Sequence, residues 1–418
     1  MRIGFISTRL NGTDGVSLEV GKWATVFRRM GHEVFFCAGE LGGYAAGGCL
    51  IPQLHFEHQS IIAFSRRAFG EGARSQDTEK LVDEIYAAAD EIRAPLRHFI
   101  RSNHLDLLVV ENALTIPMNL PLGITLTGLI AELGINTIAH HHDFYWERQR
   151  YQSNAILDLL DTNFPAKLPS IRHVTINSIA RRRLKSRRGI DSIVIPNVHD
   201  FATPPPPLDS YNRDFRQVLG LQDSDLFFLQ PTRVIQRKGI EMAISLVHHL
   251  TRFGLQNIHL FITHRAHDEG LEYWRWLKRE AGVMRVNLQL IDHLVDVQRT
   301  TKNGHKIYTL WDVYPHADLV TYPSTYEGFG NALLEAVYFK RPVVVNRYPV
   351  YNADIRPLGF DFIELDGFVD ENIVQQTYDL LQDPARIEAM TGKNYALARE
   401  HFSLEVLEAK LREVLSQF

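Results

Sequence analysis

The sequence predicts an α/β protein of two doubly wound parallel-sheet domains, and three observations support this. The 418 residues are too many for one ordinary hydrophobic core. Short runs rich in β-branched and aromatic residues alternate with longer stretches of helical periodicity, which is typical of parallel strand–helix–strand units. Four consecutive prolines at 204–207 interrupt this alternation and suit neither a helix nor a central strand. We therefore place a stiff linker at 202–210.

The first domain spans residues 1–201 and begins with a strand at 3–7. A loop containing Gly12 and Gly15 leads into a helix at 17–30, which ends at Gly31 because glycine is favoured just past a helix C-terminus. Helical connections between successive strands imply a parallel sheet. Further strands are expected at 32–38, 106–111, 135–141, 173–177 and 192–196.

The same pattern restarts in the second domain, residues 211–395. The C-terminal segment 396–418 ends in a helix, for which we consider packing back onto the first domain. Both halves are Rossmann-like, and such sheets bind ligands outside the carboxyl ends of their strands, so we expect the site in a cleft between the halves. A helix is expected at 240–253, and strands are expected at 225–230, 258–264, 286–292, 317–323 and 341–346.

The composition argues against several classes of function. Hydrophobic residues make up 45% of the chain and charged residues 22%, as in a soluble globular protein, and a net charge of −4 gives no signature of nucleic-acid binding. The only cysteines are Cys37 and Cys49, so neither a disulfide framework nor a CxxC-type metal site is expected. The start MRIGFIS lacks the layout of a signal peptide, and no apolar run would span a bilayer, so we expect a cytoplasmic protein.

A glycine-rich turn before a helix, in the stretch STYEGFGNALLEAVYF, carries the first chemical signal. Backbone N–H groups at a helix N-terminus suit a phosphate, and Gly328 and Gly330 let the backbone approach it. Asn331 and Glu335 are four residues apart and share one helix face. Because a carboxylate repels phosphate, Glu327 and Glu335 suit hydroxyl groups on either side of a diphosphate. Such a ligand is a nucleotide sugar, with the sugar at one end and the ribose at the other.

A second signal is the loop PTRVIQRKG, which follows an expected strand and opens an expected helix. Arg233 and Lys238 both suit a diphosphate, since arginine offers a fork of donors and lysine a point charge. Arg237 is the competing candidate, but the lysine before Gly239 fits better. The alternative is a solvated basic loop, and the glycine-rich turn further along the chain favours the functional interpretation.

Three consecutive histidines, in IAHHHDFYWERQRY, end an expected strand of the first domain, where a residue facing a ligand is expected. Along a strand His140 and His142 point to one side and His141 to the other. A metal site is conceivable because histidine is a common ligand, but no cysteine supports one and spacing identifies no carboxylate ligand. Histidines that only fill the rim of the cleft are the alternative.

The loop after the first strand, STRLNGTDGVSLEV, raises the rival interpretation of a dinucleotide site. The NAD fingerprint has G-x-G-x-x-G directly after the strand, whereas Gly12 and Gly15 come several residues later in a G-x-x-G. Glu40 follows the second strand and is placed like the acid that binds the ribose of NAD. The spacing of the glycines still argues against NAD.

Taken together, these motifs resemble those of retaining GT-B glycosyltransferases, especially glycosyltransferase family 4, whose E-x7-E element is similar to EGFGNALLE. The resemblance implies a GT-B fold, with Glu327 at the hydroxyls of the donor sugar and Glu335 at the ribose. The family has a similar Arg…Lys-Gly loop, which implies that Arg233 and Lys238 stabilise the leaving diphosphate. Further donor contacts implied by the resemblance are Gly15, Leu294, Gly328, Phe329, Gly330 and Asn331.

In the first domain, the resemblance implies contacts to the reacting carbon and the acceptor. The pair His142–Asp143 best matches a family histidine, often followed by an acid, that touches the donor sugar near the anomeric carbon, with His141 as the fallback. The catalytic residues implied in this way are His142, Arg233, Lys238 and Glu327. The acceptor contacts implied are Gly12, Asp14, His141 and Asp143.

The resemblance implies retaining transfer of a hexosyl group from a UDP- or GDP-linked sugar, with no metal ion and no cofactor. We expect a small soluble sugar or a glycerate-type molecule as the acceptor. The alternatives are a sugar-nucleotide epimerase of GT-B fold, or a family 4 transferase that acts on glycolipid or polysaccharide. The basic run RRRLKSRR at 181–188 is compatible with a membrane contact, but a solvated helix end explains it better.

Overall fold

The computed structural model describes residues 1–12, 15–74, 77–265 and 271–418. The chain divides into two compact units. Unit 1 comprises Met1–Asn197 together with Leu404–Phe418, and unit 2 comprises Val198–Ser403. The proline-rich segment 202–210 contains neither helix nor strand. Within the described ranges, no helix combines the length and the apolar character needed to cross a membrane.

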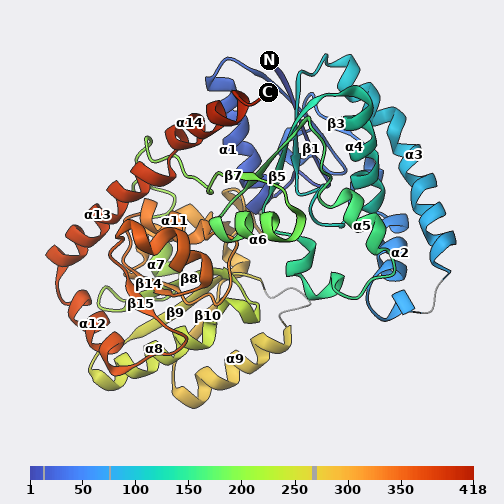
Figure 1. The fold of residues 1–418 in the computed structure, drawn as a ribbon. Coiled ribbons are helices and arrows are strands. Elements are labelled where there is room, and N and C mark those ends of the chain that lie inside the picture. The colour runs from blue at the N-terminus through green and yellow to red at the C-terminus, as the bar shows by residue number, and fades with distance from the viewer. Residues whose placement is uncertain (13–14, 75–76, 266–270) are drawn as a thin grey trace. The chain divides into compact units, whose positions relative to one another are not determined.

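Unit 1 is built on a parallel sheet whose strands lie in the order β3-β2-β1-β4-β5-β6-β7. Figure 1 shows α14, in dark red, close to α1, in blue, and the two helices are in contact. The strands of unit 1 are β1 (Arg2–Ser7), β2 (Glu33–Ala38), β3 (Cys49–Leu50), β4 (Leu107–Glu111), β5 (Asn136–His141), β6 (Ile171–Thr175) and β7 (Ser192–Val194). Its helices are α1 (Gly15–Arg29), α2 (Gln59–Ala68), α3 (Thr78–Ser102), α4 (Leu120–Leu133), α5 (Leu157–Asn163), α6 (Ser178–Arg188) and α14 (Leu404–Leu415).

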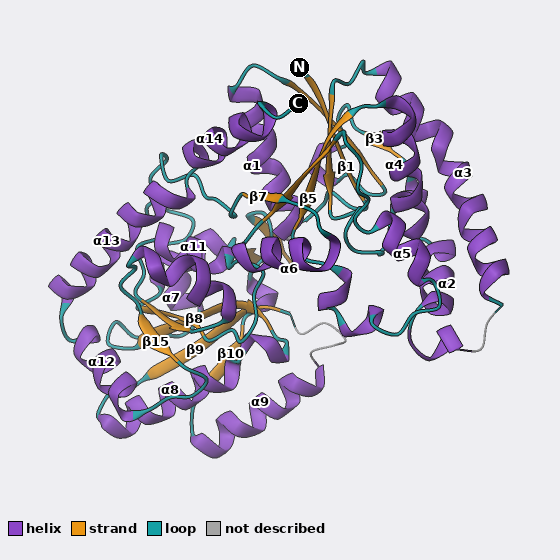
Figure 2. Cartoon of the chain, viewed as in Figure 1, coloured by secondary structure: helices purple, strands orange, loops and turns teal. Residues whose placement is uncertain are grey.

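Unit 2 repeats the architecture with a parallel sheet in the order β10-β9-β8-β13-β14-β15 and a separate antiparallel hairpin, β11–β12. Figure 2 shows the strands gathered into sheets with helices along them. The strands of unit 2 are β8 (Leu226–Arg233), β9 (Ile258–His264), β10 (Asn287–Leu290), β11 (Thr300–Lys302), β12 (His305–Ile307), β13 (Leu319–Tyr322), β14 (Val343–Asn346) and β15 (Ile363–Leu365). Its helices are α7 (Phe215–Val218), α8 (Ile240–Phe253), α9 (Leu271–Met284), α10 (Leu310–Val313), α11 (Asn331–Tyr338), α12 (Glu371–Leu381) and α13 (Pro384–Phe402).

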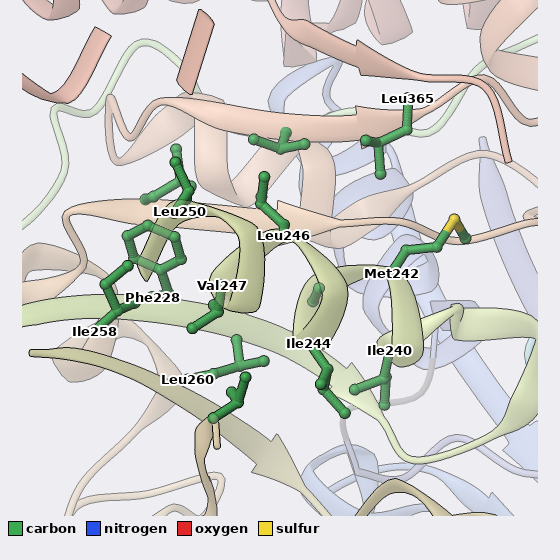
Figure 3. Close-up of a cluster of buried hydrophobic side chains, with 14 of the residues drawn as sticks. Phe228, Ile240, Met242, Ile244, Leu246, Val247, Leu250, Ile258, Leu260 and Leu365 are labelled. Carbon is green, nitrogen blue, oxygen red and sulfur yellow. The ribbon is translucent and has the colours of Figure 1, made fainter. Parts of the chain in front are cut away.

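The core of unit 2 explains why its periodic sequence folds as it does. Helix α8 buries Ile240, Ile244 and Val247 on one face, at the three- and four-residue spacing of a helix that packs on a sheet. Figure 3 shows these side chains packed with those of β8 and β9. The helix ends at Gly254, whose φ of 127° is easily reached by glycine alone.

The structure confirms the prediction of two doubly wound parallel sheets. Strands β3, β11, β12 and β15 were not predicted. Among the predicted strands, β8 continues through Arg233 instead of ending at Gln230. Its register with β9 shifts between Gln230 and Arg233, and this irregularity accommodates Pro231, which has no N–H to donate to a sheet. The extra residues carry Arg233 to the carboxyl end of the sheet.

Each sheet has one point at which the strand order reverses. In unit 1 it lies between β1 and β4, and in unit 2 between β8 and β13. Loops at the carboxyl ends of such strands diverge to opposite faces, which leaves room there for a ligand. The candidate site residues of unit 1 are therefore expected in the segments after β1 and β4, and those of unit 2 in the segments after β8 and β13.

Candidate functional site

In unit 2 the segment after β8 turns tightly and brings two cations to the end of the sheet. A short 3-10 turn, Gln236–Lys238, leads into Gly239, where α8 is capped. Gly239 has a φ of 60°, and a Cβ placed on it would lie 2.4 Å from the carbonyl oxygen of Pro323. Only glycine therefore lets this turn approach the segment that follows β13.

Both oxygens of Glu327 are bound by cations of that turn. Lys238 donates to Oε1, and Arg237 donates to Oε2 at 2.9 Å. Burial alone would raise the pKa of Glu327, but Lys238 and Arg237 outweigh it, and the net shift is downward. Burial lowers the pKa of Lys238 although Glu327 opposes the shift. The structure therefore joins two predicted site residues, Glu327 and Lys238, and adds Arg237 to them.

His264 lies near the basic side chains at the carboxyl end of the unit 2 sheet. It ends β9 beside Arg233, with which it is in register. Burial, followed by the positive charges of Arg233 and Lys238, lowers the pKa of His264 to about 4. The histidine is therefore neutral near pH 7 and adds no charge to that of Arg233, Lys238 and Glu327. Such a place suits an anion such as a diphosphate.

The predicted glycine-rich turn begins α11 in a conformation that only glycine readily adopts. Gly330 has a φ of 134°, and a Cβ on it would lie 2.7 Å from the hydroxyl oxygen of Tyr348. That hydroxyl donates to the carbonyl oxygen of Phe329 at 2.6 Å and so fixes the turn. The ring of Phe329 is buried against Phe402, with ring centroids 5.2 Å apart. A contact of Phe329 with a donor would therefore come from its backbone.

The other predicted donor contacts lie on elements of unit 2. Glu335, on α11, accepts a hydrogen bond from the hydroxyl of Tyr314 at 3.0 Å and is half-buried. Leu294 is half-buried, and its carbonyl accepts from the backbone N–H of Tyr308 at 2.8 Å. Gly328 and Asn331 are half-buried beside the turn. Their roles toward a donor remain predictions.

In unit 1 two of the three consecutive histidines converge on one buried carboxylate. Glu111 ends β4, and its Oε2 lies 2.9 Å from Nδ1 of His140 and 3.1 Å from Nε2 of His142. The backbone N–H of His142 donates to Oδ1 of Asn112 at 2.8 Å. The ring of Trp23, on α1, stacks on His140 with centroids 4.2 Å apart.

The pKa values of the two histidines shift in opposite directions because their surroundings differ. Burial would raise the pKa of Glu111, but the pairing with His140 and His142 outweighs it and lowers the pKa to about 2. For His140, burial outweighs the attraction of Glu111, and its pKa is lowered. For His142, burial also lowers the pKa, but Glu111 and Glu19 outweigh it and the net shift is upward. His142 is thus the ring that holds a proton more tightly.

His141 belongs to a separate chain of hydrogen bonds. Its Nδ1 pairs with the hydroxyl of Thr115, and its Nε2 lies 2.8 Å from Nδ1 of His173. Burial, followed by the charges of neighbouring histidines, lowers its pKa well below the ordinary value. Both ring nitrogens are used within the protein, so the geometry favours His142 over His141 as the ring that faces a substrate.

The ligand atoms of Glu111, His140 and His142 all lie within 4.8 Å of one another, a spacing that a small metal ion can bridge. Sequence spacing did not identify a carboxylate close to the histidines, and the structure shows that this carboxylate is Glu111. The nitrogen–oxygen distances of 2.9 and 3.1 Å are also ordinary lengths of hydrogen bonds. A proton on His142 supplies the positive charge that the buried carboxylate needs, and we interpret the cluster in that way.

The remaining predicted residues of unit 1 lie around the segments after β1 and β5. Asp143 forms an ion pair with Arg148 at 2.5 Å. Gly12 has a φ of 77° and is exposed, and Gly15 begins α1. Asp14 lies outside the described residues.

Glu40 and the basic run at 181–188 form hydrogen bonds or ion pairs with other residues of unit 1. Glu40, considered for a ribose of NAD, accepts a hydrogen bond from Asn11 at 2.6 Å. In the basic run on α6, Arg183 pairs with Glu147 at 2.5 Å and Lys185 pairs with Asp191 at 2.7 Å. These pairs agree with a solvated helix end.

Sequence reasoning missed Glu111 and Glu19 as site residues. Glu111 ends the apolar strand LLVVE, and an acid at the carboxyl end of a strand beside the strand-order reversal was an available signal. Glu19 lies on a helix and is fully buried although its neighbours in sequence gave no reason to expect this.

Comparison with known proteins agrees with the geometry. Residues 212–371 match the family described as Glycosyl transferases group 1. The chain is 34% identical to mannosylglucosylglycerate synthase of Thermotoga maritima over 99% of this chain and 100% of that protein. It is 32% identical to mannosylglucosylglycerate synthase of Petrotoga mobilis over 97% of this chain and 99% of that protein.

Solved structures show the same fold at low identity. The Anabaena protein HepE, in complex with UDP and glucose, has a TM-score of 0.68 and 14% identity, with 100% of both chains covered. Sucrose-phosphate synthase of Thermosynechococcus elongatus has a TM-score of 0.68 and 12% identity, with coverage of 100% of this chain and 98% of that one. The glycosyltransferase WaaG has a TM-score of 0.62 and 15% identity, with 98% of both chains covered. The fold is therefore GT-B, and the chain belongs to the group 1 glycosyltransferases and is a hexosyltransferase.

Proposed function

We propose that this hexosyltransferase moves its sugar, with retention of configuration, from a UDP- or GDP-linked donor to a hydroxyl of a glycerate-type acceptor. The proposal for the acceptor rests on the two mannosylglucosylglycerate synthases, which this chain matches over nearly its whole length. The proposal for the donor rests on the cations at the end of β8 and on solved relatives that bind UDP or UDP-glucose.

The observation that carries the proposal is the gathering of basic side chains at the end of the unit 2 sheet: Arg233 ends β8, and Arg237 and Lys238 of the next turn both bind Glu327. Negative charge grows on the nucleoside diphosphate as the glycosidic bond breaks. Fixed cations stabilise that charge without rearrangement during the reaction. These side chains take the place that a metal ion has in other transferases, and we propose that transfer needs neither a metal ion nor a cofactor.

In the proposed reaction the acceptor hydroxyl attacks the anomeric carbon from the side on which the diphosphate leaves. The bond from this carbon to the acceptor oxygen forms as its bond to the phosphate oxygen breaks. The acceptor proton moves to the departing phosphate oxygen, so no side chain of the protein has to act as a strong base. His142 orients the sugar.

Glu327 has two tasks in this proposal. It holds Lys238 and Arg237 in place, and it accepts hydrogen bonds from hydroxyls of the donor sugar. The two tasks are compatible because an ionised carboxylate offers about four acceptor positions, and the two cations occupy one on each oxygen.

A matrix of donors and acceptors tests the proposal. UDP- and GDP-linked hexoses are each combined with glycerate, glucosylglycerate, sucrose precursors and no acceptor, with and without EDTA. We expect a new glycoside only with an anionic glycerate-type acceptor, an α-linked product from an α-linked donor by NMR, and no effect of EDTA. Conversion of the donor without acceptor would indicate an epimerase, and an inverted product or loss of activity in EDTA would contradict the mechanism.

A further inference from the structure

The ring of His142 is held at one nitrogen by a group that sequence reasoning did not connect with it. Its Nε2 lies 3.1 Å from Oε2 of Glu111. Its backbone N–H is fixed by the hydrogen bond to Oδ1 of Asn112 at 2.8 Å. The side chain of His142 is 10% exposed, whereas Glu111 is completely buried. One ring nitrogen, Nδ1, is therefore left to meet a substrate.

We propose that Glu111 is a positioning residue for the transfer reaction, because it fixes the His142 ring through Nε2 and leaves Nδ1 to contact a sugar hydroxyl. A cationic imidazole carries a proton on both nitrogens. It donates through Nε2 to Glu111 and through Nδ1 to the sugar. A neutral ring that keeps its proton at Nε2 presents only a lone pair at Nδ1. The protonation state thus decides whether Nδ1 donates or accepts.

The charges around His142 favour the donating form. Burial of the ring opposes a charge, but Glu111 from β4, Glu19 from α1 and the adjacent Asp143 each raise its pKa. Glu19 is fully buried and forms an ion pair with Lys22 at 2.5 Å.

The two remaining histidines of the run are poor competitors for the proton. The pKa values of His140 and His141 are both lowered, chiefly by burial. Of these three histidines, His142 alone has a raised pKa.

The inference deepens the proposed function, since it relies on His142 facing the donor sugar. The placement of the ring by Glu111 does not rely on it and has its own readout. If His142→Ala transferred sugar at the wild-type rate, the proposed role of His142 would fail. The effect of Glu111 on the ring would still be decided by NMR.

The experiment compares wild type with Glu111→Gln, Glu111→Asp and a matched control, Glu132→Gln. Glu132 is also a carboxylate of unit 1 held by two cations, Arg93 at 2.7 Å and Arg97 at 2.5 Å. The ring of His142 is labelled with ¹⁵N, and its NMR signal is assigned as the one that is absent in His142→Asn. This signal is followed from about pH 5 to 9, a range that brackets the ordinary histidine pKa. The rate of transfer is measured over the same range.

We expect Glu111→Gln to lower the pKa of His142 and to move the basic limb of the kcat profile to lower pH. At about pH 8 kcat should fall roughly 10- to 100-fold, with a smaller change in KM, as for other residues that orient a catalytic group. Glu111→Asp should recover part of the loss, and Glu132→Gln should change neither profile. Circular dichroism confirms that each variant is folded.

Three results would overturn the inference. One is the same His142 titration in Glu111→Gln and wild type. Another is a kcat profile that Glu111→Gln leaves unchanged. The third is a His142 signal that changes when the purified protein is treated with EDTA, because the cluster would then hold a metal ion.

Discussion

Two buried carboxylates occupy corresponding places in the two units but have different partners. Glu111 ends β4, and Glu327 follows β13, and each of these strands lies just across the reversal of strand order in its sheet. Glu111 is bound by two imidazoles, whereas Glu327 is bound by an ammonium and a guanidinium. Imidazoles change charge near neutral pH, but ammonium and guanidinium groups do not.

This difference suggests a division of labour. The ammonium and guanidinium groups of unit 2 suit a ligand whose charge is constant, such as the diphosphate of a nucleotide sugar, in which both phosphates are esterified. The titratable pair of unit 1 suits contacts to neutral hydroxyls, where the choice between donor and acceptor matters more than the charge.

Replacing Lys238 should have the largest effect. Lys238→Ala removes a cation from the diphosphate and leaves Glu327 paired with Arg237. We expect kcat to fall about 10²- to 10³-fold, as when one preorganised donor to a developing charge is removed. Lys238→Ala combined with Glu327→Gln should lose less stability than the sum of the two single changes, because the double variant buries no unpaired carboxylate. Additive losses in urea denaturation would contradict the pairing.

The next largest effect should be a difference in stability between alanine substitutions at Gly330 of unit 2 and Gly12 of unit 1. Gly330→Ala forces a residue with a Cβ into a φ of 134° and against the hydroxyl of Tyr348. We expect it to lower the free energy of unfolding by about 2–4 kcal/mol. Gly12 has a φ of 77°, but a Cβ there meets no atom within 4 Å, so Gly12→Ala should cost only about 1 kcal/mol. Thermal denaturation of both variants measures the difference, and equal losses would contradict it.

A change of pH should affect kcat, through His142 of unit 1, but not nucleotide binding by unit 2. His142 has a raised pKa, so its cation is present at lower pH and is lost as the pH rises through the folded value. Above that value kcat should fall about ten-fold per pH unit. Binding of a UDP- or GDP-linked sugar, whose diphosphate is esterified at both ends and keeps its charge, should stay constant over the same range by calorimetry if Arg233 and Lys238 hold it. A parallel fall of nucleotide affinity would remove the contrast.

Exposed ion pairs should matter least. Arg183, on α6, is 47% exposed in its pair with Glu147. Arg183→Ala should change the free energy of unfolding by no more than about 1 kcal/mol and leave transfer unchanged. A large loss of activity on anionic vesicles would instead revive a membrane role for this helix.

Much of the fold followed from local patterns in the sequence. Helix α8 was predicted with the bounds that the structure has, because its apolar spacing is regular and a glycine stands at each end. The two-residue strand β3 and the short hairpin β11–β12 gave no such pattern, since so few residues carry no periodicity. The end of β8 was misplaced because Pro231 normally argues against a strand.

The candidate site was harder to predict. Motif resemblance singled out Lys238 and Glu327 as candidates, but not their ion pair, because pairing across 89 residues leaves no local signal. The link between Glu111 and His142, 31 residues apart, was missed for the same reason. Sheet topology brings both pairs together.

The central claim is that Arg233 and Lys238 of unit 2 hold the diphosphate of the donor. A crystal structure with bound UDP or GDP tests it most directly. We expect phosphate oxygens within hydrogen-bonding distance of both side chains, near the backbone N–H groups that begin α11. A diphosphate bound elsewhere, with Arg233 and Lys238 contacting no phosphate, would contradict the account.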